Sequence, residues 1–242
     1  MRRPLPPRCP HGAPAGCGRR WWQLRACSGG PAPPWRHWGL GSFVPAVPGQ
    51  SCDLCDADII SALPDNIFSD GMAEVIKYGA IKNAHILDLA AENPRENLRE
   101  LIAECVKIKR DVVMEDEFDK GARQLLNFGH TPAHAIEKLG ALRISHGSAV
   151  AAGMCIMARA AERMKLCPCG ISDELVKLCK KYSLPTTTVF SARELAAVSM
   201  SDKKRAEGKI TLVVPSLRGE CVLMKTEESE LERIFALGLS EE

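Results

Sequence analysis

The stretch SHGSAVAAGMCIMARAAERMKL, residues 145–166, decides the fold of this chain. Small and apolar side chains recur along it at helical spacing, among them Ala149, Ala152, Ile156 and Ala160. A helix of small residues lets neighbouring elements approach closely, which suits a crowded core. The stretch therefore predicts a long buried helix.

Other segments extend this prediction to a mainly α-helical domain. Residues 95–114 carry an apolar stripe at steps of three and four, typical of a long helix with one buried face. Residues 191–200 and 227–237 are shorter amphipathic candidates. Strand patterns occur only at 210–214 and 221–224, and residues 215–219 are the expected turn between them. We predict a mainly α fold with one small β-hairpin.

The first 50 residues differ in composition from the rest. They contain no Asp, Glu or Lys, but seven Arg, ten of the 16 Pro and all four Trp. Proline at this density interrupts helices and sheets. We expect an irregular segment over 1–52 and a helical domain over 53–242. An Arg-rich, acid-free segment fits an organelle transit peptide, but this one is poor in Ser and unusually rich in Trp, Cys and Pro. The product of a wrong gene model is the alternative that this composition favours.

Composition also excludes several classes of function. The formal charge of +2 favours neither nucleic acid nor an anionic membrane as a partner. No apolar run reaches the roughly 18–20 residues that a membrane-spanning helix needs. The 11 cysteines are scattered rather than arranged as a compact secreted framework. We expect mostly reduced thiols and a cytoplasmic or plastid location.

A histidine cluster is the first candidate for chemistry. In NFGHTPAH, residues 127–134, Thr131 is a suitable N-cap and Pro132 suits a first helical turn. His130 and His134 are four residues apart and share a helix face. His146 opens the next helix. Helix N-termini favour the neutral imidazole, which is the form that binds metal.

Glu74 is the candidate carboxylate for such a site. It lies in an otherwise apolar helical turn, where a buried charge needs a partner. Two histidines and one carboxylate are a common ligand set for catalytic zinc. Spacing alone leaves the alternative open that Glu74 and Lys77 are a plain helical ion pair and that the histidines are ordinary residues.

Basic residues form a second theme, and cysteine pairs a third. Basic side chains close to a metal suggest an anionic substrate such as a phosphate or a carboxylate; those in question are Lys109, Arg110, Arg123, Lys203 and Lys204. Each taken singly also fits a solvated surface charge. The pairs Cys52/Cys55 and Cys167/Cys169 are too far apart in the sequence to predict a structural zinc site.

Several motifs occur together in a fixed order: GMAEVIKYG (71–79), KRDVV (109–113), DE (116–117), the segment 123–131, HAIE (134–137), HG (146–147) and DKK (202–204). In order and approximate spacing they resemble the 3-dehydroquinate synthase family over about residues 53–240. The resemblance implies the helical metal- and substrate-binding domain of that family.

The resemblance implies a reaction and its site. The family converts 3-deoxy-D-arabino-heptulosonate 7-phosphate into 3-dehydroquinate and phosphate, in the shikimate pathway, with NAD⁺ and a divalent metal, usually Zn²⁺. It implies a phosphorylated sugar-acid substrate and is compatible with a homodimer. Carried onto this chain, the metal ligands are Glu74, His130 and His146, and the substrate-contacting residues are Lys77, Lys109, Arg123, Asn127, His134 and Lys203 or Lys204.

The chain also departs from the family pattern. We find no strand–Gly-loop–helix unit that would bind NAD⁺, and residues 59–62 read IISA where the family usually has a Thr-Leu-x-Thr contact. Ala133 replaces a usual glycine, and Ser148 stands where the family commonly has Glu. Two alternatives therefore remain: an inactive metal- and phosphate-binding remnant, or a related metal-dependent polyol dehydrogenase.

Overall fold

The computed structural model describes residues 55–116, 121–141, 143–202 and 208–239. These residues all belong to the second of two compact units, His37–Glu242. The predicted irregular segment 1–52, its boundary at residue 53, and Lys203 and Lys204 lie outside the described residues. Of the helices that are described, none is both long and apolar enough to cross a membrane.

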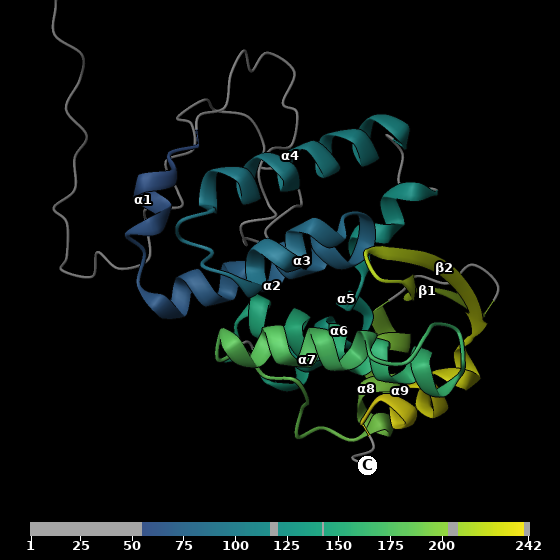
Figure 1. Cartoon of the computed structure of the whole chain (residues 1–242). Helices are drawn as coiled ribbons and strands as arrows, with labels where there is room; N and C mark the ends of the chain where they lie inside the picture. Colours follow the sequence, from purple (N-terminus) through teal and green to yellow (C-terminus); the bar gives the residue numbers. More distant parts are fainter. Residues whose placement is uncertain (1–54, 117–120, 142, 203–207, 240–242) are drawn as a thin grey trace, which may run out of the picture. The chain divides into compact units, whose positions relative to one another are not determined.

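Helices dominate the described part of the chain (Figure 1). The α-helices are α1 (Ala57–Ser61), α2 (Asp65–Lys82), α3 (Ala84–Ala91), α4 (Leu98–Glu115), α5 (His130–Leu139), α6 (His146–Arg163), α7 (Ile171–Lys181), α8 (Ala192–Asp202) and α9 (Leu231–Leu239). Short 3-10 helices are η2 (Ala122–Asn127) and η3 (Glu228–Glu230). Strands β1 (Lys209–Leu217) and β2 (Glu220–Glu227) pair antiparallel. The predicted fold class, mainly α with one small hairpin, is confirmed.

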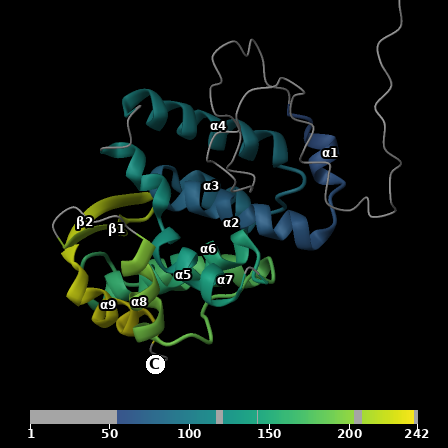
Figure 2. The same cartoon turned by 180° about the vertical axis from the view of Figure 1, so that it is seen from behind.

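Helix α6 is the core helix that its small residues predict. It lies among the other helices in both views (Figure 1, Figure 2) and packs on α2, α5, α7 and α9. A Cβ atom on Gly153 would lie 2.1 Å from the carbonyl oxygen of Gly129, so only glycine permits this approach of α6 to the start of α5. The small side chains therefore set how closely the site-bearing helices approach.

Helix α2 packs on α6, and α4 packs on α2. From Gly71 to Ile81 every residue of α2 is buried, which leaves Glu74 and Lys77 inside the core. Helix α4 buries the predicted apolar stripe, including Leu101, Cys105 and Ile108, and its opposite face is largely exposed. Because Gly71–Ile81 is buried, a charge on this part of α2 needs a partner within the fold.

The hairpin is longer than predicted and its turn is shorter. Pro215 is not in the turn but in β1, where it pairs with Cys221 beside an irregularity in the register. The turn is confined to Arg218 and Gly219, and Gly219 takes a positive φ of 77°. The sequence pattern does not predict α3 and α7, and the start of the predicted 227–237 helix is instead strand end and 3-10 helix.

Candidate metal centre

Glu74 is a buried carboxylate whose two oxygens have different surroundings. Its Oε2 accepts a hydrogen bond from Lys77 Nζ at 2.6 Å, so the predicted helical ion pair exists. Its Oε1 is buried and has no hydrogen-bond partner in the described structure. A buried carboxylate oxygen without a donor is costly. The ion pair therefore accounts for only one oxygen, and the other faces a cluster of imidazoles.

His130 reaches this oxygen because α5 begins two residues earlier than predicted. Thr131 is not the N-cap; Gly129 is, with a left-handed φ of 75°. The Gly129 carbonyl already accepts the Ala133 N–H at 3.1 Å, so the helix starts at His130 and Thr131 lies inside it. This start brings His130 Nε2 to 3.8 Å from Glu74 Oε1.

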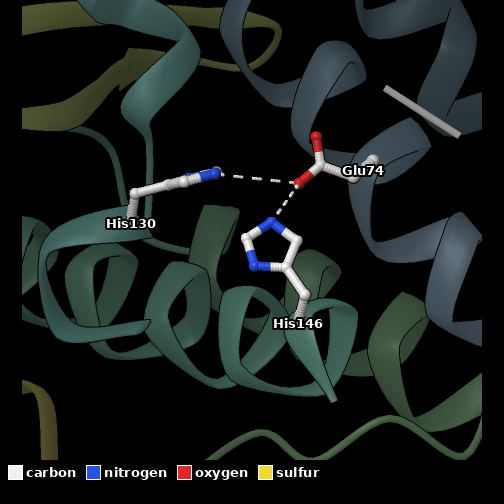
Figure 3. A group of neighbouring side chains, drawn as sticks. All are labelled: Glu74, His130 and His146. Atoms are coloured by element: carbon white, nitrogen blue, oxygen red, sulfur yellow. Dashed lines mark ion pairs between the residues drawn. The ribbon is translucent and has the colours of Figure 1, made fainter. Parts of the chain in front are cut away.

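His146 approaches the same oxygen from the first residue of α6. Ser145 precedes it as the N-cap, as the predicted start of this helix requires. His146 Nε2 lies 3.4 Å from Glu74 Oε1. Figure 3 shows both rings directed at the carboxylate from the helices facing α2. The ligand atoms of Glu74, His130 and His146 all lie within 4.8 Å of one another.

The far nitrogen of each ring is held by an acceptor. His130 Nδ1 lies 3.1 Å from the backbone carbonyl oxygen of Phe128, and His146 Nδ1 lies 3.1 Å from Glu137 Oε1. A carbonyl oxygen only accepts, so the Nδ1 of His130 carries the hydrogen. In the neutral His130 ring, Nε2 then carries the lone pair that a metal would need. Acceptors on the outer nitrogens are the usual support for histidines that bind metal.

Burial and neighbouring charges shift the pKa values of all three candidate ligands. Burial raises the pKa of Glu74, but the charge of Lys77 and the neighbouring His146 and His130 outweigh burial and leave it well below its usual range. Burial and the charge of Lys77 hold the pKa of His130 well below its usual value. Burial lowers the pKa of His146, but the hydrogen bond to Glu137 and the nearby carboxylate of Glu74 raise it to about 9. The metal-free site thus holds a proton on His146 between two carboxylates.

A divalent cation fits this donor set. One carboxylate oxygen and two imidazole nitrogens converge, the oxygen lacks a donor, and both imidazoles are supported from behind. Such a set leaves coordination positions open for water or substrate. Within the described residues, no other group of three or more His, Cys, Asp or Glu side chains is close enough to hold a metal.

Four of the other predicted site residues lie around this centre. The ring centroids of His134 and His130 are 5.6 Å apart, edge to face, so the shared helix face is confirmed. Lys77 contacts Glu74 directly. Burial lowers the pKa of Lys109 on α4 to about 8, and the positive charges of Lys77 and Arg123 contribute in the same direction. Lys77, Lys109 and Arg123 therefore form a cationic cluster beside the ligand set.

The remaining predictions for the site have mixed outcomes. Asn127 is exposed at the end of η2, and in the described structure its side chain makes no hydrogen bond. Lys203 lies outside the described residues. The described cysteines are free, including Cys55, Cys167 and Cys169. Glu137 was not predicted as a site residue, although it lies two helical turns after His130, at i+7, on the same face.

Comparison with known proteins places the chain in a family. Residues 71–205 match the model of the 3-dehydroquinate synthase C-terminal domain, a span that contains Glu74, both histidines and the cationic cluster. The chain belongs to the 3-dehydroquinate synthase family. It is 39% identical over 180 residues to the 3-dehydroquinate synthase of Clostridium perfringens strain 13, covering 72% of this chain and 51% of that protein.

A second relative of the 3-dehydroquinate synthase family gives a similar result. The chain is 37% identical over 201 residues to the 3-dehydroquinate synthase of Streptococcus suis strain 05ZYH33, covering 78% of this chain and 57% of that protein. The chain thus spans about half the length of these curated relatives. What the full-length relatives do is therefore taken up as a proposal for this chain.

Solved structures share the fold of this family member. ValA, a 2-epi-5-epi-valiolone synthase from Streptomyces hygroscopicus subsp. jinggangensis 5008 with NAD⁺ and Zn²⁺ bound, matches with a TM-score of 0.66 at 17% identity, over 76% of this chain and 54% of that chain. A 2-deoxy-scyllo-inosose synthase with carbaglucose-6-phosphate, NAD⁺ and Co²⁺ matches with a TM-score of 0.61 at 23% identity, over 76% and 56%. At these identities the likeness shows the fold.

Proposed function

We propose that this chain is the metal- and substrate-binding half of a 3-dehydroquinate synthase, a carbon–oxygen lyase that converts 3-deoxy-D-arabino-heptulosonate 7-phosphate into 3-dehydroquinate and phosphate. The observation that carries the proposal is the buried, donor-free Oε1 of Glu74, on which His130 and His146 converge. Family membership and the adjacent cationic cluster support it. Zn²⁺ or another divalent metal is the proposed ligand of Glu74, His130 and His146, and NAD⁺ the proposed hydride acceptor.

Each side chain has a role that its surroundings support. A divalent metal held here would acidify a hydroxyl group of the substrate. Lys77, Lys109 and Arg123 bind and orient the anionic carboxylate and phosphate groups, because cations in a partly buried site interact strongly with such groups. We assign the same task to Lys203. His134, edge-on to His130, is placed to move a proton or to donate to an oxyanion. Asn127 remains in the proposal as a substrate contact.

The cationic cluster also bears on the alternatives. A small uncharged polyol offers nothing for Lys77, Lys109 and Arg123 to neutralise, so the cluster favours a phosphorylated acid over a polyol dehydrogenase substrate. An inactive remnant, in contrast, would keep both the cluster and the metal. Only turnover separates that alternative from the enzyme.

The test uses the full chain, stripped with a chelator and reloaded with Zn²⁺ or Co²⁺. We expect about one metal ion per chain, and release of phosphate from the heptulosonate phosphate only when both NAD⁺ and metal are present. The matched pair of variants is His130→Ala, which removes a proposed ligand, and His85→Ala, which removes an exposed histidine paired with Glu100 on the surface. Only the first should lose the metal.

The outcomes separate the hypotheses. Metal binding without phosphate release supports the inactive remnant. Oxidation of an uncharged polyol without phosphate release supports the dehydrogenase. A parent chain that binds no divalent metal, or a His130→Ala variant that binds it like the parent, contradicts the proposal itself.

A further inference from the structure

Asp70 connects the helix that carries Glu74 to the helix that begins at His146. Its Oδ1 accepts a hydrogen bond from the Ser148 backbone N–H at 3.0 Å, and another from the Ser145 hydroxyl. The Ser145 hydroxyl oxygen lies farther from the same N–H, at 3.4 Å. A carboxylate near a helix N-terminus is also favoured by the helix dipole. The first turn of α6 is therefore capped by a side chain from α2.

The cap lies at a close approach of the two helices. A Cβ atom on Gly147 would lie 2.0 Å from the Asp70 carbonyl oxygen and 2.6 Å from its Oδ1. No side chain fits between the backbones there. The hydrogen bonds of Asp70 thus act across a direct contact, in which a small sliding of either helix would break them.

This acid cannot come from α6 itself. A capping box places Glu or Gln three residues after an N-cap Ser or Thr. Here Ser145 is the N-cap and that position holds Ser148, so the first turn of α6 contains no acidic residue. A carboxylate from within α6 would stabilise only that helix, whereas Asp70 also determines where α6 lies along α2.

The position along α2 matters for the metal centre. Asp70 and Glu74 are four residues apart on α2, so they share one face. On α6, His146 lies between Ser145 and Ser148, the two residues that Asp70 holds. One turn of α2 therefore separates the Asp70 cap from the Glu74–His146 contact of 3.4 Å. By holding α6 in place along α2, the Asp70 hydrogen bonds also hold His146 next to Glu74.

We infer that Asp70 is a positioning residue: by capping α6 from α2, it fixes the register that brings His146 to Glu74. The inference rests on the metal centre proposed above. Asp70 need not touch the metal or the substrate for this role. It acts through the hydrogen bonds to Ser145 and Ser148.

The test compares Asp70→Ala, which removes the acceptor, with Asp70→Asn, which keeps an oxygen acceptor of the same length. The control is Asp65→Ala, which removes an acid from the start of the same helix, where it pairs with Arg95. Co²⁺ affinity and the Co²⁺ absorption spectrum report the ligand geometry. Amide hydrogen exchange over residues 145–149 in metal-free chain reports the cap.

We expect Asp70→Ala to weaken Co²⁺ binding about 10–100-fold, the usual range for a residue that orients a ligand, to change the Co²⁺ spectrum, and to speed exchange at Ser148. Asp70→Asn should restore most of the affinity, and Asp65→Ala should leave it unchanged. A purely structural role would lower thermal stability while leaving affinity and spectrum as in the parent, and that result overturns the inference.

Two further arms keep the test decisive. If Asp70→Ala does not fold, Asp70→Glu takes its place, because it keeps the charge and displaces the acceptor; parent-like Co²⁺ affinity in that variant overturns the inference. If the parent chain binds no Co²⁺, that result contradicts the proposed function. Hydrogen exchange needs no metal, and unchanged exchange at Ser148 in Asp70→Ala then rejects the Asp70 cap separately.

Discussion

Two charged clusters in this molecule differ in how completely their groups are satisfied. Arg218, in the hairpin turn, donates to both oxygens of Glu174 on α7 and to Asp88 on α3. These side chains are 30–55% exposed. At the metal centre, Glu74 and Lys77 are 5–6% exposed, and Glu74 Oε1 has no donor.

The difference separates surface charges that are paired with one another from buried charges arranged for chemistry. Exposed pairs in water add little stability and are screened by salt. Buried charges are costly and persist only when they are paired or await a ligand. The charges of the Arg218 cluster are paired within the chain, whereas the Glu74 cluster leaves one carboxylate oxygen without a donor, the position of the proposed cation.

Removing the Glu74 carboxylate should have the largest effect. Glu74→Ala leaves Lys77 charged and buried, which should destabilise the chain by about 3–5 kcal/mol in urea unfolding with chelator present. It should also abolish Co²⁺ binding. The double variant Glu74→Ala/Lys77→Met should regain much of the stability and none of the metal binding. A Glu74→Ala variant that still binds Co²⁺ like the parent would show that the donor-free oxygen is not a ligand.

Glu137 should affect metal binding through His146. Glu137→Gln weakens the support of His146 Nδ1 and should lower Co²⁺ affinity about 10–100-fold. The pKa of His146 is raised to about 9, so in the parent at pH 7.5 metal binding must displace its proton, and affinity should rise with pH up to about 9. Calorimetry in buffers of different ionisation enthalpy counts that proton. If Glu137→Gln releases as many protons on metal binding as the parent does, the displaced proton does not come from His146.

The raised pKa of His146 also predicts how the stability of the metal-free chain changes with pH. Between the ordinary value for histidine and about 9, the folded chain holds more protons at His146 than the unfolded chain. The stabilisation from this group is therefore present at low pH and is lost as pH rises through about 9. In Glu137→Gln this loss should move to lower pH, which urea unfolding at several pH values would measure.

Lys109 should give a smaller effect on anion binding. Its pKa is lowered to about 8 by burial and by the positive charges of Lys77 and Arg123. Sulfate, whose own charge is constant above pH 4, should therefore bind more weakly as pH rises through about 8. Lys109→Met should bind about tenfold more weakly at pH 7, the low end for a charged hydrogen bond, and lose this pH step. A step that persists in Lys109→Met would assign it to another group.

The sequence predicts the parts of this fold that depend on local spacing. The small residues of 145–166 indicate α6, and the apolar stripe of 95–114 indicates α4. The order of the motifs indicates that Glu74, His130 and His146 are the candidate metal ligands. Helix spacing also places His134 beside His130, as observed. These features need only the helical repeat and the sequence order.

Contacts between helices were not predictable in the same way. The hydrogen bond from Ser148 to Asp70 joins residues 78 positions apart in the chain. The contact between His146 and Glu137 joins residues nine positions apart. Both depend on how α2, α5 and α6 pack. The start of α5 at His130 depends on the left-handed conformation of Gly129, which fits against α6. Pro215 lies inside β1 because the strand tolerates it beside a register irregularity, which no local pattern shows.

The smallest effect should come from the satisfied cluster. Arg218→Met removes the hydrogen bonds to Glu174 and Asp88, but leaves exposed acids that water can solvate, so the unfolding midpoint should fall by a few degrees at most. That difference should shrink in high salt, because salt screens exposed charges. Co²⁺ affinity should stay that of the parent at both salt concentrations. A loss of metal binding in Arg218→Met would mean that the hairpin turn and the metal centre are coupled, and the contrast between the two clusters would then fail.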